Sequence, residues 1–250
     1  GITLCCESPV TSSTYIDLTI ASLQTFGVDV SDELTDSKRV IHVPQTRITH
    51  RELDIEPDAS SAVYFAAVAA LHKGMTITLE GLSLDSAQPD MEAIRLLGSI
   101  GAEVIDTDSG ICVTGTGTIH GFEDVDASGF PDASLCLAAV AAFADSPSRI
   151  YGLETLPLKE SDRIEAMARS LAKVGCGIAS SDSDIRISPM ETSNTKVAID
   201  PVDDHRIAMA MAVVGTKRNG VSIVNPTCVS KSYPNFWSDL RNVYEGREVT

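Results

Sequence analysis

Four basic residues and two carboxylates stand at positions where charged side chains could act together on an anion. They are Lys159, Arg163, Arg206 and Lys231, with Asp132 and Glu160. Lysine and arginine bind phosphate and carboxylate groups through charge-assisted hydrogen bonds, and a carboxylate held beside them can transfer a proton. The set therefore suits a substrate that is both phosphorylated and carboxylated, acted on by acid/base catalysis.

Each of these residues also has a purely structural interpretation. Lys159 and Arg163 are four apart, so both could face one side of the first turn of a solvent-exposed helix. Asp132 could be a helix N-cap and nothing more, and His205 is more readily a structural hydrogen-bond partner. Cations at a helix N-terminus are mildly unfavourable against the helix dipole, which favours an anion bound at the same point.

A repeated sequence suggests how the charges are brought together. Pro-Asp-Ala-Ser occurs at residues 57–60 and again at 131–134, and each copy opens an alanine-rich run. Such self-similarity indicates a reused structural unit. If the units pack around a pseudo-symmetry axis, equivalent helix starts converge on one surface, and the six charged residues meet there.

The unit is expected to contain a helix, a strand, a second helix and a β-hairpin. Strands are predicted at 2–6, 75–80 and 221–224, and hairpins at 104–113 and 178–187. In the second helix, Ile94, Leu97 and Ile100 have helical spacing before a glycine stop. Asp58 and Asp132 stand where helix N-caps are expected.

Composition limits the partners and the location. Lys and Arg total 19 against 35 Asp and Glu, for a net charge of −16, which argues against a nucleic-acid partner. No apolar run is long enough to cross a membrane, and no signal-peptide pattern is visible. The expectation is a cytoplasmic protein, or a plastid one if the source is a plant or alga.

Both ends of the chain fall inside a repeat. The first unit begins at its strand, near residue 2, without an opening helix, and the last stops after its second helix, around 236–243. We therefore expect an incomplete portion of a larger protein, or one half of a split one.

The charged motifs are similar to those of the 5-enolpyruvylshikimate-3-phosphate synthase family. The matching segments are SSTYID (12–17), PDASSA (57–62), FPDA (130–133), LKESDRI (158–164), DDHRIAM (203–209) and CVSKSYP (228–234). They follow one another in the family's order, and the resemblance extends over essentially all 250 residues.

The resemblance implies an α/β fold of the enolpyruvyl transferase type. In that family, two domains each contain three βαβαββ-type units around a pseudo-threefold axis, with the substrates in the cleft between them. Residues 1–56 would be the last unit of a first domain that is only partly present. Residues 57–250 would be the second domain, lacking the final hairpin, which the family completes with its extreme N-terminus.

The resemblance also implies a reaction and a role for each residue. The family transfers the enolpyruvyl group of phosphoenolpyruvate to the 5-hydroxyl of shikimate 3-phosphate, through a tetrahedral intermediate and without metal or cofactor. Arg163, Arg206 and Lys231 would bind phosphoenolpyruvate. Asp132 and Glu160 would move protons, and which of them is the acid stays open.

The shikimate ligand has its own implied contacts. Lys159 would help to hold it and tune the carboxylates, while Ser12 and Tyr15 would contact it from the first domain. Thr155 stands where the family usually has a ligand-binding asparagine. The implied partner is the missing N-terminal half of the same enzyme, without which the chain should be nearly inactive.

Two other functions remain open on the sequence. One is the related transfer of enolpyruvyl to UDP-N-acetylglucosamine, whose enzyme is expected to lack the segment 159–163 in this form. The other is a non-catalytic domain that keeps only the fold. The chain retains every mapped cation and both carboxylates, which argues against this second function.

Overall fold

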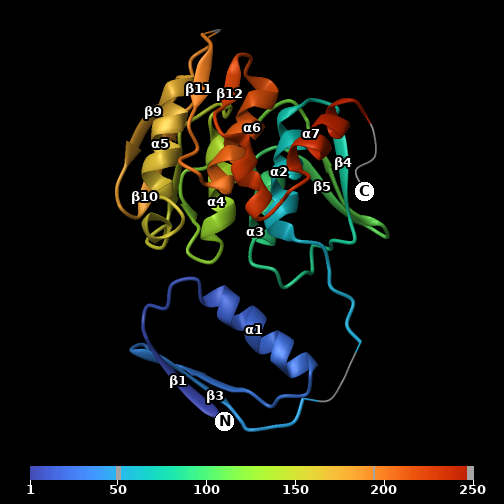
Figure 1. Ribbon diagram of the computed structural model, residues 1–250, viewed down its shortest axis with the longest axis vertical. Helices are drawn as coiled ribbons and strands as arrows, with labels where there is room; N and C mark the ends of the chain where they lie inside the picture. Colours follow the sequence, from blue (N-terminus) through green and yellow to red (C-terminus); the bar gives the residue numbers. More distant parts are fainter. Residues whose placement is uncertain (49–51, 194, 247–250) are drawn as a thin grey trace.

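The structure is a computed structural model that describes residues 1–48, 52–193 and 195–246. Two lobes are visible in Figure 1, a small one from the N-terminal part of the chain and a larger one from residue 59 onward. Each lobe has its own hydrophobic cluster. Residues 44–48 and 52–57, between the lobes, form neither helix nor strand.

The small lobe is one helix on a three-stranded antiparallel sheet. It contains β1 (Ile2–Glu7), α1 (Ser13–Thr25), β2 (Ser31–Leu34) and β3 (Lys38–Val43), with the strand order β1-β3-β2. Val28, Val30 and Ile41 form its small buried core. The strand predicted at 2–6 is confirmed as β1.

The larger lobe opens with a unit that follows the predicted order. It consists of α2 (Ala59–Leu71), β4 (Thr76–Glu80), α3 (Met91–Ser99), β5 (Glu103–Thr107) and β6 (Gly110–Thr114). Its sheet is antiparallel in the order β4-β6-β5. Asp58 caps α2 by accepting the backbone N–H of Ser60, so the predicted N-cap is confirmed.

The second unit repeats the order with one added strand, and the third also has an added strand but no hairpin among the described residues. The second contains β7 (Val125–Asp126), α4 (Pro131–Ala141), β8 (Ser148–Tyr151), the 3-10 helix η1 (Leu156–Leu158), α5 (Arg163–Val174), β9 (Gly177–Ser180) and β10 (Asp184–Ser188). The third contains β11 (Val197–Ile199), α6 (His205–Lys217), β12 (Val221–Ile223), the 3-10 helix η2 (Pro226–Lys231) and α7 (Phe236–Tyr244).

The added strands β7 and β11 pair in parallel with the strand that follows each central helix. The second sheet has the order β7-β8-β10-β9, and the third, among the described residues, is the pair β11-β12. The added strands are two and three residues long, which is too short for an alternating sequence pattern to predict them. The predicted repeat of helix, strand, helix and hairpin is confirmed in the first two of these units.

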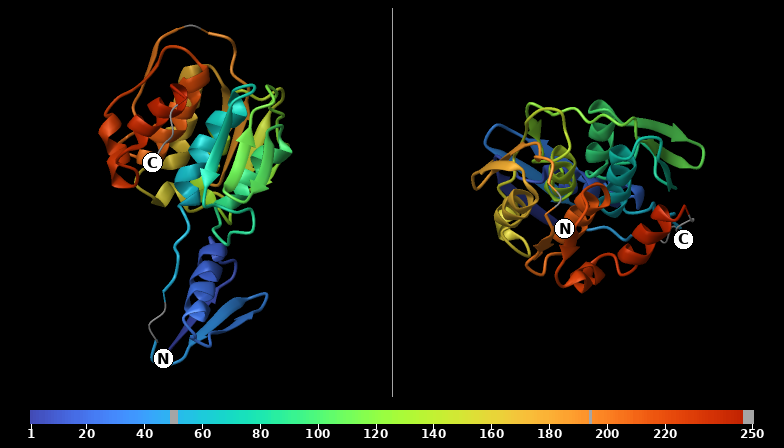
Figure 2. Two further views of the ribbon diagram at one scale, coloured as in Figure 1. Left: turned by 90° about the vertical axis from the view of Figure 1, so that its right-hand side faces the viewer. Right: turned by 90° about the horizontal axis from the view of Figure 1, so that it is seen from above.

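Three central helices, α2, α4 and α6, pack against one another in the middle of the larger lobe (Figures 1 and 2). All three are buried almost all round, as expected for helices that are apolar on every face. Their many alanines allow the close approach this requires. The packing aligns the helices so that their first turns, which carry the charged motifs, lie at one end of the lobe.

Candidate active site

Asp132 lies in the first turn of α4, at the centre of the predicted cluster. The predicted N-cap role is wrong: Phe130 is the N-cap residue and Pro131 takes the first helical position. Proline is favoured at that position because its missing N–H would be unpaired there in any case. The Asp132 carboxylate is therefore free to interact with side chains: it accepts a hydrogen bond from Arg163 and forms ion pairs with Lys159 and Arg206.

Arg163 holds the cluster together. Its Nη1 donates to Asp132 Oδ1 at 2.8 Å, its Nη2 to Glu160 Oε2 at 2.6 Å, and its Nε to Asp204 Oδ2 at 2.8 Å. The side chain is only 1% exposed. One buried guanidinium thus fixes three carboxylates that come from three different segments of the chain.

The other three cations surround the same carboxylates. Lys159 Nζ lies 3.5 Å and Arg206 Nη2 3.2 Å from Asp132, while Lys231 forms an ion pair with Glu160. All six residues that the sequence predicted to meet do meet. Lys159, however, lies just after η1 and not on α5, so it does not share a helical turn with Arg163.

The charges of the cluster determine the protonation states at neutral pH. Burial acts to raise the pKa of Glu160, but the hydrogen bond from Lys231 and the charge of Arg163 outweigh it and lower that pKa to about 2. Glu160 is therefore ionised and can accept a proton. Burial and the neighbouring Arg206 lower the pKa of His205, which favours the neutral imidazole.

The small lobe reaches the cluster through the first turn of α1. The Tyr15 hydroxyl donates to Asp90 Oδ1 at 3.1 Å, and the backbone N–H of Ser12 donates to the Ser128 carbonyl at 3.2 Å. Burial and the charges of Asp90 and Asp132 raise the pKa of Tyr15. Tyr15 is thus neutral and close enough to Asp132 to be affected by its charge.

Thr155 is placed differently from the other predicted residues. It precedes η1, and its hydroxyl is buried without a hydrogen-bond partner among the described residues. It is not among the residues that pair with Asp132 or Glu160. An unpaired buried hydroxyl costs free energy, which a ligand can recover by bonding to it.

Two buried carboxylates of the site were missed by the sequence analysis. Asp204 is fully buried and accepts from Arg163 and Ser161, while also capping α6 through the Arg206 N–H. It lies in the motif 203–209, so its identity was visible but its burial was not. Asp90 is 1% exposed, and no feature of the sequence marked it.

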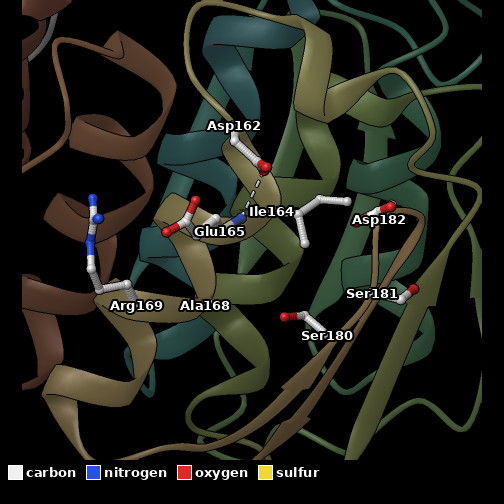
Figure 3. Close-up of a pocket in the computed structure, with 8 residues that line it drawn as sticks. All are labelled: Asp162, Ile164, Glu165, Ala168, Arg169, Ser180, Ser181 and Asp182. Atoms are coloured by element: carbon white, nitrogen blue, oxygen red, sulfur yellow. Dashed lines mark hydrogen bonds between the residues drawn. The ribbon is translucent and has the colours of Figure 1, made fainter.

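A separate pocket of about 360 Å³ lies on the far side of α5, against the hairpin of β9 and β10 (Figure 3). It is lined by Asp162, Ile164, Glu165, Ala168, Arg169, Ser180, Ser181 and Asp182. None of the six clustered residues lines it, and Figure 3 shows the Asp162 carboxylate bonded to the Glu165 N–H as a helix cap. The clustered residues therefore form a site distinct from this pocket.

The chemistry of the site is that of an anion receptor with a base. Within residues 1–48, 52–193 and 195–246, no group of three or more histidine, cysteine or acidic side chains is arranged to hold a metal ion. In the same residues no helix is long and apolar enough to cross a membrane.

Known proteins that are similar to this chain in sequence and fold are enolpyruvyl transferases. The family model described as EPSP synthase (3-phosphoshikimate 1-carboxyvinyltransferase) matches residues 1–240. Relatives named 3-phosphoshikimate 1-carboxyvinyltransferase are 39% identical over 94% of this chain in Methanosphaerula palustris and 34% over 95% in Idiomarina loihiensis. These matches cover 53% and 54% of the relatives, so the chain spans about half of their length.

Solved structures agree on the fold. EPSP synthase from Acinetobacter baumannii superposes with a TM-score of 0.77 at 24% identity, covering 96% of this chain and 56% of that one. The enolpyruvyl transferase NikO from Streptomyces tendae gives a TM-score of 0.66 at 19% identity, covering 97% and 55%. The α/β enolpyruvyl transferase fold expected from the motifs is confirmed, and the chain belongs to the EPSP synthase family.

Proposed function

We propose that this chain provides one half of the active site of a 3-phosphoshikimate 1-carboxyvinyltransferase. The enzyme would transfer the enolpyruvyl group of phosphoenolpyruvate to the 5-hydroxyl of shikimate 3-phosphate and release phosphate. The observation that carries the proposal is the Arg163 network, which unites two carboxylates able to move protons with cations able to hold two anionic substrates.

The geometry suggests how the cations are shared with a ligand. Arg163 is buried and fully paired, so in this state it orders the carboxylates and is not itself free to bind phosphoenolpyruvate. Lys231 and Lys159 are the more exposed cations, and each is paired with a carboxylate. An incoming phosphate or carboxylate would compete for these lysines and release Glu160 and Asp132 for proton transfer.

Glu160 is the stronger candidate for the base that takes the proton of the attacking hydroxyl. With a pKa of about 2 it is ionised in the ligand-free site, and the release of Lys231 to an incoming anion would raise that pKa and make Glu160 a better base. Asp132, which is hydrogen-bonded to Arg163 and lies near Arg206, would then carry out the proton transfer at the methylene carbon of phosphoenolpyruvate. Ser12, Tyr15 and Thr155 would contact shikimate 3-phosphate.

We further propose that the rest of the active site comes from the remainder of the enzyme. The separate hydrophobic clusters of the two lobes support a domain boundary near residue 56, with 1–56 ending one domain and 57–250 forming the other. The half-length match to relatives supports a complementary N-terminal half as partner.

Phosphate release by the complete gene product tests the substrates. We expect release from phosphoenolpyruvate only when shikimate 3-phosphate is present. Release that depends on UDP-N-acetylglucosamine instead would assign the related reaction, and no release with either acceptor would favour a non-catalytic role.

A pair of matched variants tests the site. Glu160→Gln should lower kcat by about 10²–10⁴-fold, because it removes a base positioned for proton transfer. Glu165→Gln makes the same change on the far side of α5, in the separate pocket, and should retain near-normal kcat. Equal losses in both variants would exclude a specific role for Glu160.

A further inference from the structure

Asp90 stands at a helix N-cap position without capping the helix. It occupies the N-cap position of α3, but its side chain makes no capping hydrogen bond. Asp58, Asp162 and Asp204, at the same position of α2, α5 and α6, each accept a backbone N–H of their own helix. The Asp90 carboxylate is therefore committed to something other than capping.

Both oxygens of Asp90 accept hydrogen bonds from hydroxyl groups. Tyr15 donates to Oδ1 at 3.1 Å, and Ser60, at the start of α2, donates to Oδ2. The residue is 1% exposed, and burying a carboxylate in this way is costly unless its charge is compensated. Burial raises the pKa of Asp90, and the hydrogen bond from Ser60 and the charge of Arg206 offset this only in part.

The bond between Tyr15 and Asp90 joins the two lobes beside the charged cluster. Tyr15 belongs to α1 of the small lobe, and Asp90 to the first unit of the larger lobe. The same turn of α1 is held at a second place, because Thr14 Oγ1 donates to the Gly129 carbonyl at 2.5 Å. A side chain at Gly129 would crowd this contact, since a Cβ there would lie 3.1 Å from Thr14 Cγ2.

We propose that Asp90 is a positioning residue that fixes the direction in which Tyr15 presents its hydroxyl to the acceptor substrate. Because the phenol proton points at Asp90, the Tyr15 oxygen has a lone pair left to offer a ligand. Tyr15 then accepts a hydrogen bond from a hydroxyl of the ligand and does not donate one to its phosphate. The inference rests on the proposed function for the identity of the ligand, but not for the pairing itself.

Kinetics of the complete gene product test the positioning role. Asp90→Ala and Tyr15→Phe should each raise KM for shikimate 3-phosphate about tenfold, the effect of about one hydrogen bond, with kcat and KM for phosphoenolpyruvate changed less than about twofold. The double variant should be no worse than Asp90→Ala alone, because one interaction is removed in all three. Asp90→Asn keeps an acceptor oxygen and should restore most of the affinity.

Asp106→Ala is the matched control. Asp106 also accepts a serine hydroxyl, from Ser83 at 2.9 Å, in the same unit but on the exposed β5. Its loss should leave both KM values unchanged. Equal KM increases for the two substrates in Asp90→Ala, multiplying effects in the double variant, or failure of Asp90→Asn to restore affinity would overturn the inference.

A ligand-free measurement separates this inference from the proposed function. In thermal unfolding, each single variant should lower Tm by about 2–4 °C and the double variant by no more than the larger single. Additive losses would overturn the pairing of Tyr15 with Asp90 even in an active enzyme. Coupled losses in a protein that does not turn over shikimate 3-phosphate would support the pairing and reject the proposed substrate.

Discussion

At the scale of single residues, the site depends on how one guanidinium divides its donors. Arg163 donates from Nη1 to Asp132, from Nη2 to Glu160 and more distantly to Asp204, and from Nε to Asp204, and almost none of its surface is exposed. Removing one partner of a buried ionic network leaves the remaining charges uncompensated, which costs far more than the network contributes when intact. The loss of Arg163 should therefore affect stability as well as activity.

Arg163→Met should lower the free energy of unfolding by about 3–5 kcal/mol, because three carboxylates lose their shared cation. Arg169→Met, six residues further along the same helix, replaces an exposed arginine and should change the free energy of unfolding by less than about 0.5 kcal/mol. Chemical denaturation of both variants measures the difference. A similar, small effect for Arg163→Met would mean that the network is not formed in solution.

The depressed pKa of Glu160 predicts a pH dependence with a definite sign. Its pKa is about 2 in the folded protein, against 4.5 as the unperturbed value. The ionised form thus stabilises the folded state above about pH 4.5, and this contribution is lost as the pH falls toward 2. The Tm of the unmutated protein minus that of Glu160→Gln should decrease over this range. A difference that stays constant between pH 5 and pH 2.5 would contradict the assigned pairing with Lys231.

The sequence predicted the residues of the cluster better than their pairing. The basic residues could be identified because the chain is strongly acidic and has few of them, and because they occupy equivalent positions of the repeat. Asp90 and Asp204 could not be identified in the same way, because their importance comes from burial, which depends on packing between distant segments. The N-cap prediction for Asp132 fails because Pro131 takes the first helical position, which makes Phe130 the N-cap residue.

At the scale of elements, six helices begin near one another. Tyr15, Ser60, Asp90, Asp132 and Arg163 lie in or at the first turn of α1, α2, α3, α4 and α5, and Arg206 lies in that of α6. Their mutual contacts link these starts into one surface. A cap that sets where such a helix begins therefore also positions a functional side chain.

Variants of the cap residues Asp162 and Asp58 test whether a helix cap positions a functional side chain. Asp162→Ala and Asp58→Ala each remove an N-cap hydrogen bond and should cost about 1 kcal/mol of unfolding free energy. Asp162→Ala should also reduce kcat more strongly, because Arg163 is the first residue of the helix that it caps. Denaturation and steady-state kinetics of the two variants provide the comparison, and equal activity losses would argue against positioning by the α5 cap.

At the scale of the whole molecule, the third unit differs from its neighbours. In the second unit, β8 pairs with β7 on one side and with β10 on the other, whereas within the described residues β12 pairs with β11 alone. A groove of about 570 Å³ runs beside β12, and its lining includes Trp237, Leu240 and Tyr244 of α7. We expect the proposed N-terminal half to supply the strands that cover it.

Trp237 is the only tryptophan of the chain and reports on this groove. When the chain is combined with the complementary half, its fluorescence emission should shift to shorter wavelength, because covering the indole removes it from water. The variant Trp237→Phe supplies the background from the added half. Assembly that restores phosphate release without any shift would place the complementary strands elsewhere.

The attachment of the small lobe by the first turn of α1 has a mechanical consequence. The helix has 13 residues and is therefore ~20 Å long. Because its first turn is held by Asp90 and Gly129, the helix can rotate only about that end, and a tilt of ~10° there displaces its far end by ~3 Å. A small shift of Tyr15 on binding a ligand hydroxyl would therefore change the orientation of the whole sheet of the small lobe.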